Sequence, residues 1–512
     1  MWQIEAKELD AQFVPVPALL EKKYLKTIFN CHQCTETLDK GSFDKLKTGR
    51  QRLNKKGKSS TAAQKMLTLR PCNVRTYTHI MNDKPSILLV NPPIYDFAAF
   101  DFWLKPLGML SVAGKIAKSA DLKIFDFLDR KHKFYKDKPQ FKIDNWGRGK
   151  FFSVKIQKPK VFDKIPRYFQ RFGVPAEIFV EYLKTHNPCD FVFIQTVMTY
   201  WYLGYREVIE MIRKHWPRTK IVLGGPYIMI CPEHSKSLGA DFVFTEENKL
   251  WDFLDIKPDG SFLPVWNVYE KIETAAMKIT NGCPFKCTYC VVPMLGDGFS
   301  TKPMKQAIEE LNFLVSLGVK NIAFYDDALL YKNDEVLKPF LQYLIENKIK
   351  ISFHTPNALN ARFIDEEIAE LMVKAGFKSF YLGFESGSEQ FQRQTGAKIF
   401  DNEFTDAVKA LIAAGADKNN IIAYQVFGHP NFEIQQVEES LEFANNLGVR
   451  IMLASFSPIP GTPDGRLAGK YVDMNEPLCH NKTAFPIILF GSEKVNHIKD
   501  MCSKLNHNLQ NK

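Results

Sequence analysis

Apolar runs of strand length alternate with amphipathic helical segments along most of this 512-residue chain, in two successive series. A run of Val, Ile, Leu and Phe with little polar alternation suits a strand covered on both faces, as in a parallel sheet. In the first series such runs occur at 86–93, 122–129, 190–196, 220–226 and 241–247, with helical periodicity at 108–120 and 205–216. We therefore expect an α/β fold that begins with a Rossmann-like, doubly wound parallel sheet within residues 81–250.

The second series consists of six strand–helix units. Strands are predicted at 275–280, 321–327, 351–355, 379–385, 421–428 and 450–458, and helices at 304–318, 365–376, 402–415 and 435–448. Six β/α units in a row predict a partial, TIM-type (β/α)6 barrel over residues 270–465. Its chemistry is expected at the carboxyl ends of the strands.

Three segments fall outside this alternation. Residues 1–80 are predicted to be a basic, flexible extension, and Met81 stands where a compact domain would begin. The CHQC sequence at 31–34 is half of a zinc knuckle, which we interpret as incidental cysteines because a structural site needs four ligands. The aromatic and basic stretch at about 130–185 is expected to be an insertion over the crevice of the first sheet, and residues 466–512 to be a C-terminal tail.

The formal net charge of +11 lies mostly at the start of the chain. Residues 1–84 hold sixteen Lys and Arg against eight Asp and Glu, a net charge of +8, so the remaining 428 residues carry only +3. A nearly neutral body argues against nucleic acid as the main partner. No apolar run approaches the ~20 residues of a spanning helix, and the acidic N-terminus does not resemble a signal peptide. We therefore expect a cytoplasmic enzyme without membrane insertion.

Three cysteines, Cys283, Cys287 and Cys290, stand in the loop that follows the first strand of the second series. Three thiolates bind three irons of a [4Fe–4S] cluster and leave the fourth iron open to substrate or cofactor, whereas a closed structural site needs a fourth ligand. The alternative is a Cys₃His zinc site completed by His354 or His429. The missing fourth thiol favours the cluster.

The cysteine loop, CPFKCTYC at 283–290, resembles the CxxxCxxC signature of the radical S-adenosylmethionine (radical SAM) enzymes, with an aromatic residue, Tyr289, before the last cysteine. Four further stretches resemble that family in its order: 324–330, 383–389, 427–433 and 456–463. The resemblance implies that the open iron binds S-adenosylmethionine and that a donor such as flavodoxin or ferredoxin reduces the cluster. Reductive cleavage would then give a 5′-deoxyadenosyl radical that attacks an unactivated carbon of a small molecule or biosynthetic intermediate.

The same resemblance implies which residues contact S-adenosylmethionine. Asp326 and Asp327 would lie near the methionine ammonium, and Glu385 and Ser386 near the ribose hydroxyls and the sulfonium. Tyr289 would support the cofactor from the cysteine loop. The adenine slot would be shaped by Gly428, Pro430, Phe456 and Pro458. The alternative for each is strand-end capping, support or ordinary turn chemistry.

Residues 85–250 resemble the cobalamin (vitamin B12)-binding domain that precedes the barrel in one subgroup of that family. The likeness rests on ILLVNPP, PLGMLSVAG, IVLGGP and GADFVFTEE. The subgroup's D-x-H-x-x-G loop is absent, and His132 has the wrong spacing to replace it, so we expect no lower axial histidine. Gly224 and Gly225 would allow close approach of a cobalamin tail, or they form an ordinary turn. Substrate recognition and pure scaffolding remain alternatives to bound cobalamin.

These expectations combine into a radical SAM enzyme, with methyl transfer as its reaction if cobalamin binds. Methylthiolation of RNA or protein is an alternative, although it would bring a second cysteine triad and a C-terminal nucleic-acid-binding barrel, and only about 50 residues follow position 463. A second alternative is a nucleic-acid-binding protein with a structural metal site. Deleting residues 1–80 distinguishes the two classes, because cleavage of S-adenosylmethionine should survive the deletion and salt-sensitive binding should not.

Overall fold

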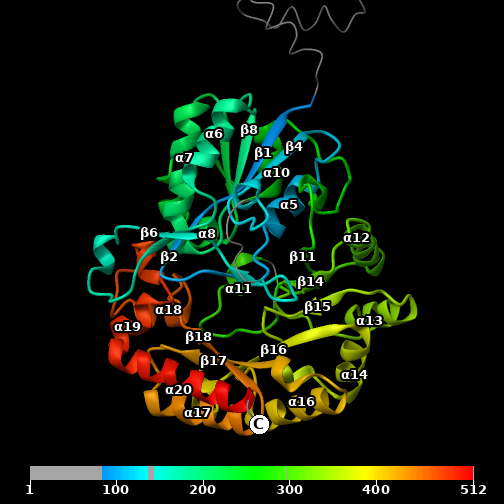
Figure 1. The fold of residues 1–512 in the computed structure, drawn as a ribbon, viewed down its shortest axis with the longest axis vertical. Coiled ribbons are helices and arrows are strands. Elements are labelled where there is room, and N and C mark those ends of the chain that lie inside the picture. The colour runs from blue at the N-terminus through cyan, green and yellow to red at the C-terminus, as the bar shows by residue number, and fades with distance from the viewer. Residues whose placement is uncertain (1–83, 137–142, 297, 511–512) are drawn as a thin grey trace, which may run out of the picture. The chain divides into compact units, whose positions relative to one another are not determined.

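The computed structural model describes residues 84–136, 143–296 and 298–510 (Figure 1). The expected extension at 1–80, with its CHQC sequence, lies outside the described residues. Within the described part, two parallel sheets follow one another along the chain.

The first sheet has five parallel strands in the order β10-β9-β8-β1-β4. These strands are β1 (Ser86–Asn91), β4 (Asp121–Asp126), β8 (Phe191–Gln195), β9 (Lys220–Gly224) and β10 (Phe242–Val243). Helices α6 (Ala176–Thr185) and α7 (Tyr202–His215) cover one face, and α5 (Leu107–Gly114) and α10 (Glu247–Leu254) the other (Figure 1). Numbered along the chain, the order is the 2-1-3-4-5 of flavodoxin-like folds, which confirms the predicted doubly wound sheet.

The second sheet has six parallel strands in the order β11-β14-β15-β16-β17-β18. They are β11 (Thr274–Met277), β14 (Asn321–Phe324), β15 (Ser352–His354), β16 (Phe377–Glu385), β17 (Ile421–Phe427) and β18 (Arg450–Ser455). The connecting helices are α12 (Met304–Ser316), α13 (Leu337–Glu346), α14 (Glu366–Ala375), α16 (Asp401–Ala413) and α17 (Ile434–Asn446). In the described residues β11 and β18 do not pair, so the barrel is open on one side, as predicted for a partial (β/α)6 barrel.

Local sequence fixes where these helices begin and end. Asp365 precedes α14, and its side chain accepts a hydrogen bond from the amide of Ile368 at 2.8 Å. Gly376 ends the same helix at φ = 102°, a left-handed conformation that glycine adopts without steric cost. Strand β16 starts immediately afterwards, at Phe377, so the turn at Gly376 fixes where this strand begins.

The insertion predicted at about 130–185 is shorter than expected. Its last ten residues form α6, which is the crossover helix between β4 and β8 and belongs to the first sheet. The amphipathic pattern of α6 lies directly behind a long aromatic and basic stretch, which hid it. Before α6, β7 (Gln170–Phe172) pairs antiparallel with β2 (Ile94–Asp96) and β6 (Ser153–Lys155), and β5 (Gly149–Lys150) pairs with β3 (Phe100–Asp101).

The expected C-terminal tail is helical, and it contacts the barrel strand β18 as well as the small antiparallel sheet that contains β2. It contains α18 (Pro463–Ala468), α19 (Ala484–Phe490) and α20 (Ser492–Gln510). Asn481 donates to Asp96 of β2 at 2.9 Å, and His480 lies 2.9 Å from the hydroxyl of Thr199. Among the described helices, none is long and apolar enough to span a bilayer.

Candidate active site at the strand ends of the barrel

The three cysteines lie on the loop between β12 (Thr280–Asn281) and α11 (Val292–Leu295), beyond the carboxyl end of β11. The amide of Cys290 donates to the carbonyl of Cys287 at 3.0 Å, and the amide of Val292 lies 3.5 Å from Sγ of Cys290. Gly396 packs against this loop so closely that an added Cβ would lie 3.1 Å from Cα of Cys287. The loop is therefore held in place by the chain that follows β16.

All three thiols are half-buried and free of disulfides. Burial raises the pKa of Cys283 and Cys287, and raises that of Cys290 to about 11. A reactive nucleophile would show a lowered pKa, so the raised pKa of these thiols gives no sign of nucleophilic activation. Ionisation of three neighbouring thiols requires positive charge nearby, which metal ions supply.

A buried cation already lies beside the thiols. The Lys398 side chain is only 18% exposed and donates to Oε1 of Glu385 at 2.6 Å. Burial acts to lower the pKa of Lys398, but the charges of Glu385 and Cys287 outweigh it, and the pKa is raised. An added Cβ at Gly383 would lie 2.6 Å from Nζ of Lys398, so this glycine leaves room for the lysine. Three thiols beside a fixed cation fit an anionic iron–sulfur cluster.

The zinc alternative does not fit the histidines. His354 is fully buried, and its ring nitrogens lie 2.9 Å from Oγ of Ser379 and 3.1 Å from Oδ1 of Asn321. Nδ1 of His429 accepts from the amide of Asn431. Across the described ranges, no three His, Cys, Asp or Glu side chains surround a position for a single metal ion.

Of the two aspartates after β14, Asp326 is buried and Asp327 is half-buried. Oδ1 of Asp326 accepts from the Ile279 amide at 2.9 Å and from the Thr280 hydroxyl at 2.7 Å, so it holds the end of the strand before the cysteine loop. Its Oδ2 is buried without a partner among the described residues, and burial raises its pKa to about 6. Asp327 forms an ion pair with Lys278 at 3.1 Å.

Glu385 and Ser386 lie at the carboxyl end of β16, where the strand is irregular. Glu385 has φ = 64°, a left-handed value that is uncommon for a residue with a side chain, and the register with β17 shifts between Gly383 and Glu385. Gln425 supports the turn by donating to the Glu385 carbonyl at 2.8 Å. The Ser386 hydroxyl accepts from the amide of Ser388 at 2.9 Å. Strain of this kind is frequent at functional sites.

The remaining expected cofactor residues surround an aromatic cluster. Tyr289 packs with Phe456, Ala468 and Phe485, and burial raises the pKa of Tyr289. Pro458 is buried and Pro430 is half-buried. Gly428 has φ = 85° and abuts Pro486, whose Cγ would lie 2.5 Å from an added Cβ. The close contact with Pro486 thus explains why a glycine stands at position 428. Tyr289 and Phe456 lie in the same aromatic cluster.

A tie between α18 and the cysteine loop was missed from the sequence. The Thr288 hydroxyl donates to Oδ2 of Asp464 at 2.6 Å. Nε2 of His429 lies 2.9 Å from the same carboxylate, although not at the angle of a hydrogen bond. Thr288 lies inside the cysteine motif, but its partner is 176 residues away, and no local signal links the two.

The concave side of the barrel is filled by an aromatic plug from the first half of the chain. Ala323 and Tyr381 alternate with main-core residues along their strands, so both face the concave side, where Trp103 packs against them. Trp103 is fully buried at φ = 58°, and its indole donates to the carbonyl of Trp146 at 2.8 Å. Arg148 donates to the Tyr381 hydroxyl at 2.5 Å, with its guanidinium 5.3 Å from the Trp103 ring.

The crevice of the first sheet lies at the ends of β1 and β8, the switch point at which flavodoxin-like folds bind ligands. A small hollow there is lined by Asn91, Gln195 and Leu104. Gly225 has φ = 120°, and an added Cβ would lie 1.9 Å from the Thr196 carbonyl oxygen, so close packing explains this glycine. An added Cβ at Gly224 would lie 3.8 Å from Cβ of Phe244, an ordinary contact, and α8 (Pro226–Ile230), which follows, contacts α11 of the cysteine loop.

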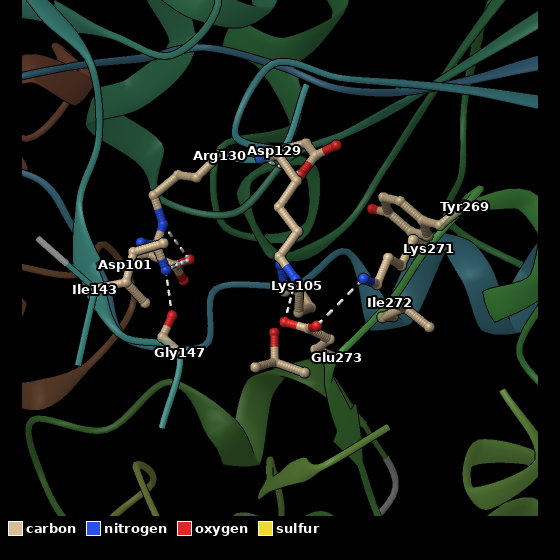
Figure 2. Close-up of a pocket in the computed structure, with 12 residues that line it drawn as sticks. Asp101, Lys105, Asp129, Arg130, Ile143, Gly147, Tyr269, Lys271, Ile272 and Glu273 are labelled. Carbon is tan, nitrogen blue, oxygen red and sulfur yellow. Dashed lines mark hydrogen bonds and ion pairs between the residues drawn. The ribbon is translucent and has the colours of Figure 1, made fainter. Parts of the chain in front are cut away.

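A second cavity, which the sequence did not predict, lies between the end of β4 and the start of β11 (Figure 2). The cavity is open to solvent, and the empty space between its lining residues, including solvent at its mouth, is about 590 Å³. Figure 2 shows Arg130 paired with Asp101, and Lys271 directed toward Glu273. Most of its charges are therefore neutralised by neighbours.

Comparison with known proteins identifies a family match in the part of the chain that forms the second sheet. Residues 277–444 match the family model described as the Radical SAM superfamily. The threonylcarbamoyladenosine tRNA methylthiotransferase MtaB of Thermotoga maritima is 23% identical over 52% of this chain and 65% of its own length. The hopanoid C-2 methylase of Rhodopseudomonas palustris is 25% identical over 32% of this chain and 36% of its own length. The chain thus spans less than two thirds of these relatives.

Among solved structures, the radical S-adenosylmethionine methyltransferase TsrM from Kitasatospora setae, with cobalamin and a [4Fe–4S] cluster bound, has a TM-score of 0.53. The match covers 76% of this chain and 79% of that chain at 14% identity. At this identity the likeness is one of fold, and it includes both sheets.

Proposed function

Because residues 277–444 match the Radical SAM superfamily, we propose that the chain is a radical SAM enzyme in which Cys283, Cys287 and Cys290 hold a [4Fe–4S] cluster. The fourth iron of the cluster would be left for S-adenosylmethionine. When bound and reduced, the cluster would supply the electron that cleaves S-adenosylmethionine to methionine and a 5′-deoxyadenosyl radical, which takes hydrogen from an unactivated carbon. The observation that carries this proposal is three half-buried thiols beside Lys398, with no fourth cysteine on the loop.

The surrounding residues would orient the cofactor and exclude water. Glu385, at the irregular end of β16, would accept hydrogen bonds from ribose hydroxyls. The Oδ2 of Asp326, which has no partner among the described residues, would face the methionine ammonium or the strand end that Asp326 supports. Tyr289 and Phe456 would form an apolar wall. The plug of Trp103 removes water from the concave side, which a reactive radical requires.

The test is anaerobic reconstitution with iron and sulfide, followed by measurement of bound iron and of 5′-deoxyadenosine. We expect about four irons per chain. Cys287→Ala should lose both iron and product, whereas the control Cys502→Ala, on α20, should keep both. Undiminished 5′-deoxyadenosine in Cys287→Ala would refute the ligand assignment.

We further propose that the first sheet binds cobalamin and that the reaction is methyl transfer. The fold shared with cobalamin-bound TsrM and the contact of α8 with the cysteine-loop helix support this proposal. His132, whose Nδ1 accepts from the Phe134 amide, is not among the residues that line the crevice. Cobalamin would therefore bind without it. Retention of cobalamin on gel filtration, read from its visible absorption, tests the proposal, and release of all cobalamin would contradict it.

Methylthiolation of RNA or protein is the second candidate, because MtaB is among the matching relatives. Within the described part, residues 84–250 contain only Cys189 and Cys231, so the domain of the first sheet does not itself hold a second cysteine triad. Mass spectrometry of the product distinguishes an added methyl group from an added methylthio group. In either case a flavodoxin or ferredoxin is the proposed electron donor.

A further inference from the structure

A basic hairpin, defined here as residues 149–172, projects from the side of the first sheet (Figure 1). It is anchored by its own small core: Phe162 and Phe169 are buried and meet the ring of Phe97 at 4.9 and 5.2 Å. The amide of Ile156 donates to the Phe169 carbonyl at 3.1 Å. The hairpin therefore presents its outer side chains from a fixed backbone.

The outer side of the hairpin is strongly cationic. Residues 149–172 hold seven Lys and Arg against one Asp, a net charge of +6 within a body that is otherwise close to neutral. Four exposed lysines have no carboxylate within ion-pair distance among the described residues: Lys150, Lys155, Lys160 and Lys164. An unpaired group of cations on a rigid hairpin indicates an anionic partner.

Tyr168 adds a stacking surface to these cations. Its side chain is 69% exposed, and Nζ of Lys155 lies 3.6 Å from the ring centroid. The exposed ring is the kind of platform on which a base stacks, while neighbouring ammonium groups meet phosphates. An anionic membrane would call instead for an amphipathic helix with a continuous apolar face, whereas this surface is a β-hairpin whose exposed apolar side chains are Val154, Val161 and the one ring of Tyr168.

We propose that the basic hairpin binds single-stranded nucleic acid, with its four exposed lysines on phosphates and Tyr168 stacked on a base. This inference does not rest on the iron–sulfur cluster, because it uses only residues of the hairpin. The hairpin would allow the protein to bind a polynucleotide substrate, although the net charge of the body is close to zero. RNA and DNA share this chemistry, and the experiment separates them.

The experiment measures binding of the full-length protein to fluorescein-labelled 20-nucleotide oligouridylate and oligothymidylate by fluorescence anisotropy. Four phosphate contacts predict that affinity falls about 50-fold between 50 and 200 mM KCl. We expect K155Q/K160Q/K164Q to weaken binding at least tenfold at low salt and to flatten the salt dependence. Tyr168→Ala should weaken binding about tenfold, and Tyr168→Phe should retain it.

The matched control is K236Q/K249Q/K305Q, which removes the same charge from exposed positions on α9 (Pro232–Lys236), α10 and α12 and should bind as wild type. Residues 1–83 are present in every protein, so differences between variants report the hairpin. A difference between the two oligonucleotides identifies the strand as RNA or DNA. Equal affinities of wild type and triple variant would overturn the proposal, as would hairpin-dependent binding to phosphatidylserine vesicles without binding to either oligonucleotide.

Discussion

The indole of Trp103 lies stacked on the imidazole of His354, with ring centroids 4.2 Å apart and the planes inclined by 21°. The two residues come from different halves of the chain, and both are fully buried. The stack thus couples the loop before α5 to the third strand of the barrel.

Trp103→Ala should destabilise the protein by about 3–5 kcal/mol, because it removes a large buried ring and leaves a cavity against Ala323 and Tyr381. Trp103→Phe should cost clearly less. Urea denaturation of the two variants measures the difference. Equal stability of Trp103→Ala and wild type would mean that the ring does not fill the barrel.

The pH dependence of stability should contain a contribution from His354. Burial, with a smaller effect from Arg148, lowers its pKa to about 3 from the ordinary 6.5. Between pH 6.5 and 3 the imidazole of His354 is therefore protonated in the unfolded chain but neutral in the folded chain. The free energy of unfolding consequently falls as the pH drops through this range, by on the order of 4 kcal/mol. Asp326, with its raised pKa, has the opposite trend. Comparing unfolding of wild type and His354→Gln across this range isolates the histidine, and parallel curves would contradict the assignment.

Lys398→Gln should make the proposed cluster harder to reduce. If Cys283, Cys287 and Cys290 bind the cluster as thiolates, removing this buried cation lowers the reduction potential by on the order of 100 mV. Lys398→Arg keeps the charge and should shift the potential much less. Redox titration followed by electron paramagnetic resonance measures both, and identical potentials in Lys398→Gln and wild type would separate the lysine from the cluster.

The paired glycines after β9 should respond differently to alanine. Gly225→Ala places a Cβ against the Thr196 carbonyl at a left-handed φ, so a loss of at least about 2 kcal/mol in unfolding free energy is expected. Gly224→Ala has space and should fold normally, with weaker cobalamin retention if the cofactor lies there. Thermal unfolding measures the stability of the two variants, and the visible spectrum of the purified proteins measures how much cobalamin they retain.

The sequence predicted what depends on local pattern. Continuous apolar runs placed the strands of both sheets, and Cys283, Cys287 and Cys290 stood out because their spacing is itself local. Lys398, Trp103 and Asp464 were missed, because each gains its role from partners far away in the chain: Glu385 and the thiols, His354, and Thr288. Asp326 was expected near the cofactor, but its bonds to the neighbouring strand end could not be read from FYDDALL.

The plug of Trp103 also bears on protein engineering. A barrel expressed from about residue 270 onward would present its hollow face, with Tyr381 and His354, to water, and would be prone to aggregation. Chimaeras that exchange the front half between relatives would need a matching ring at this position. The two halves of the chain are therefore better exchanged together than as separate modules.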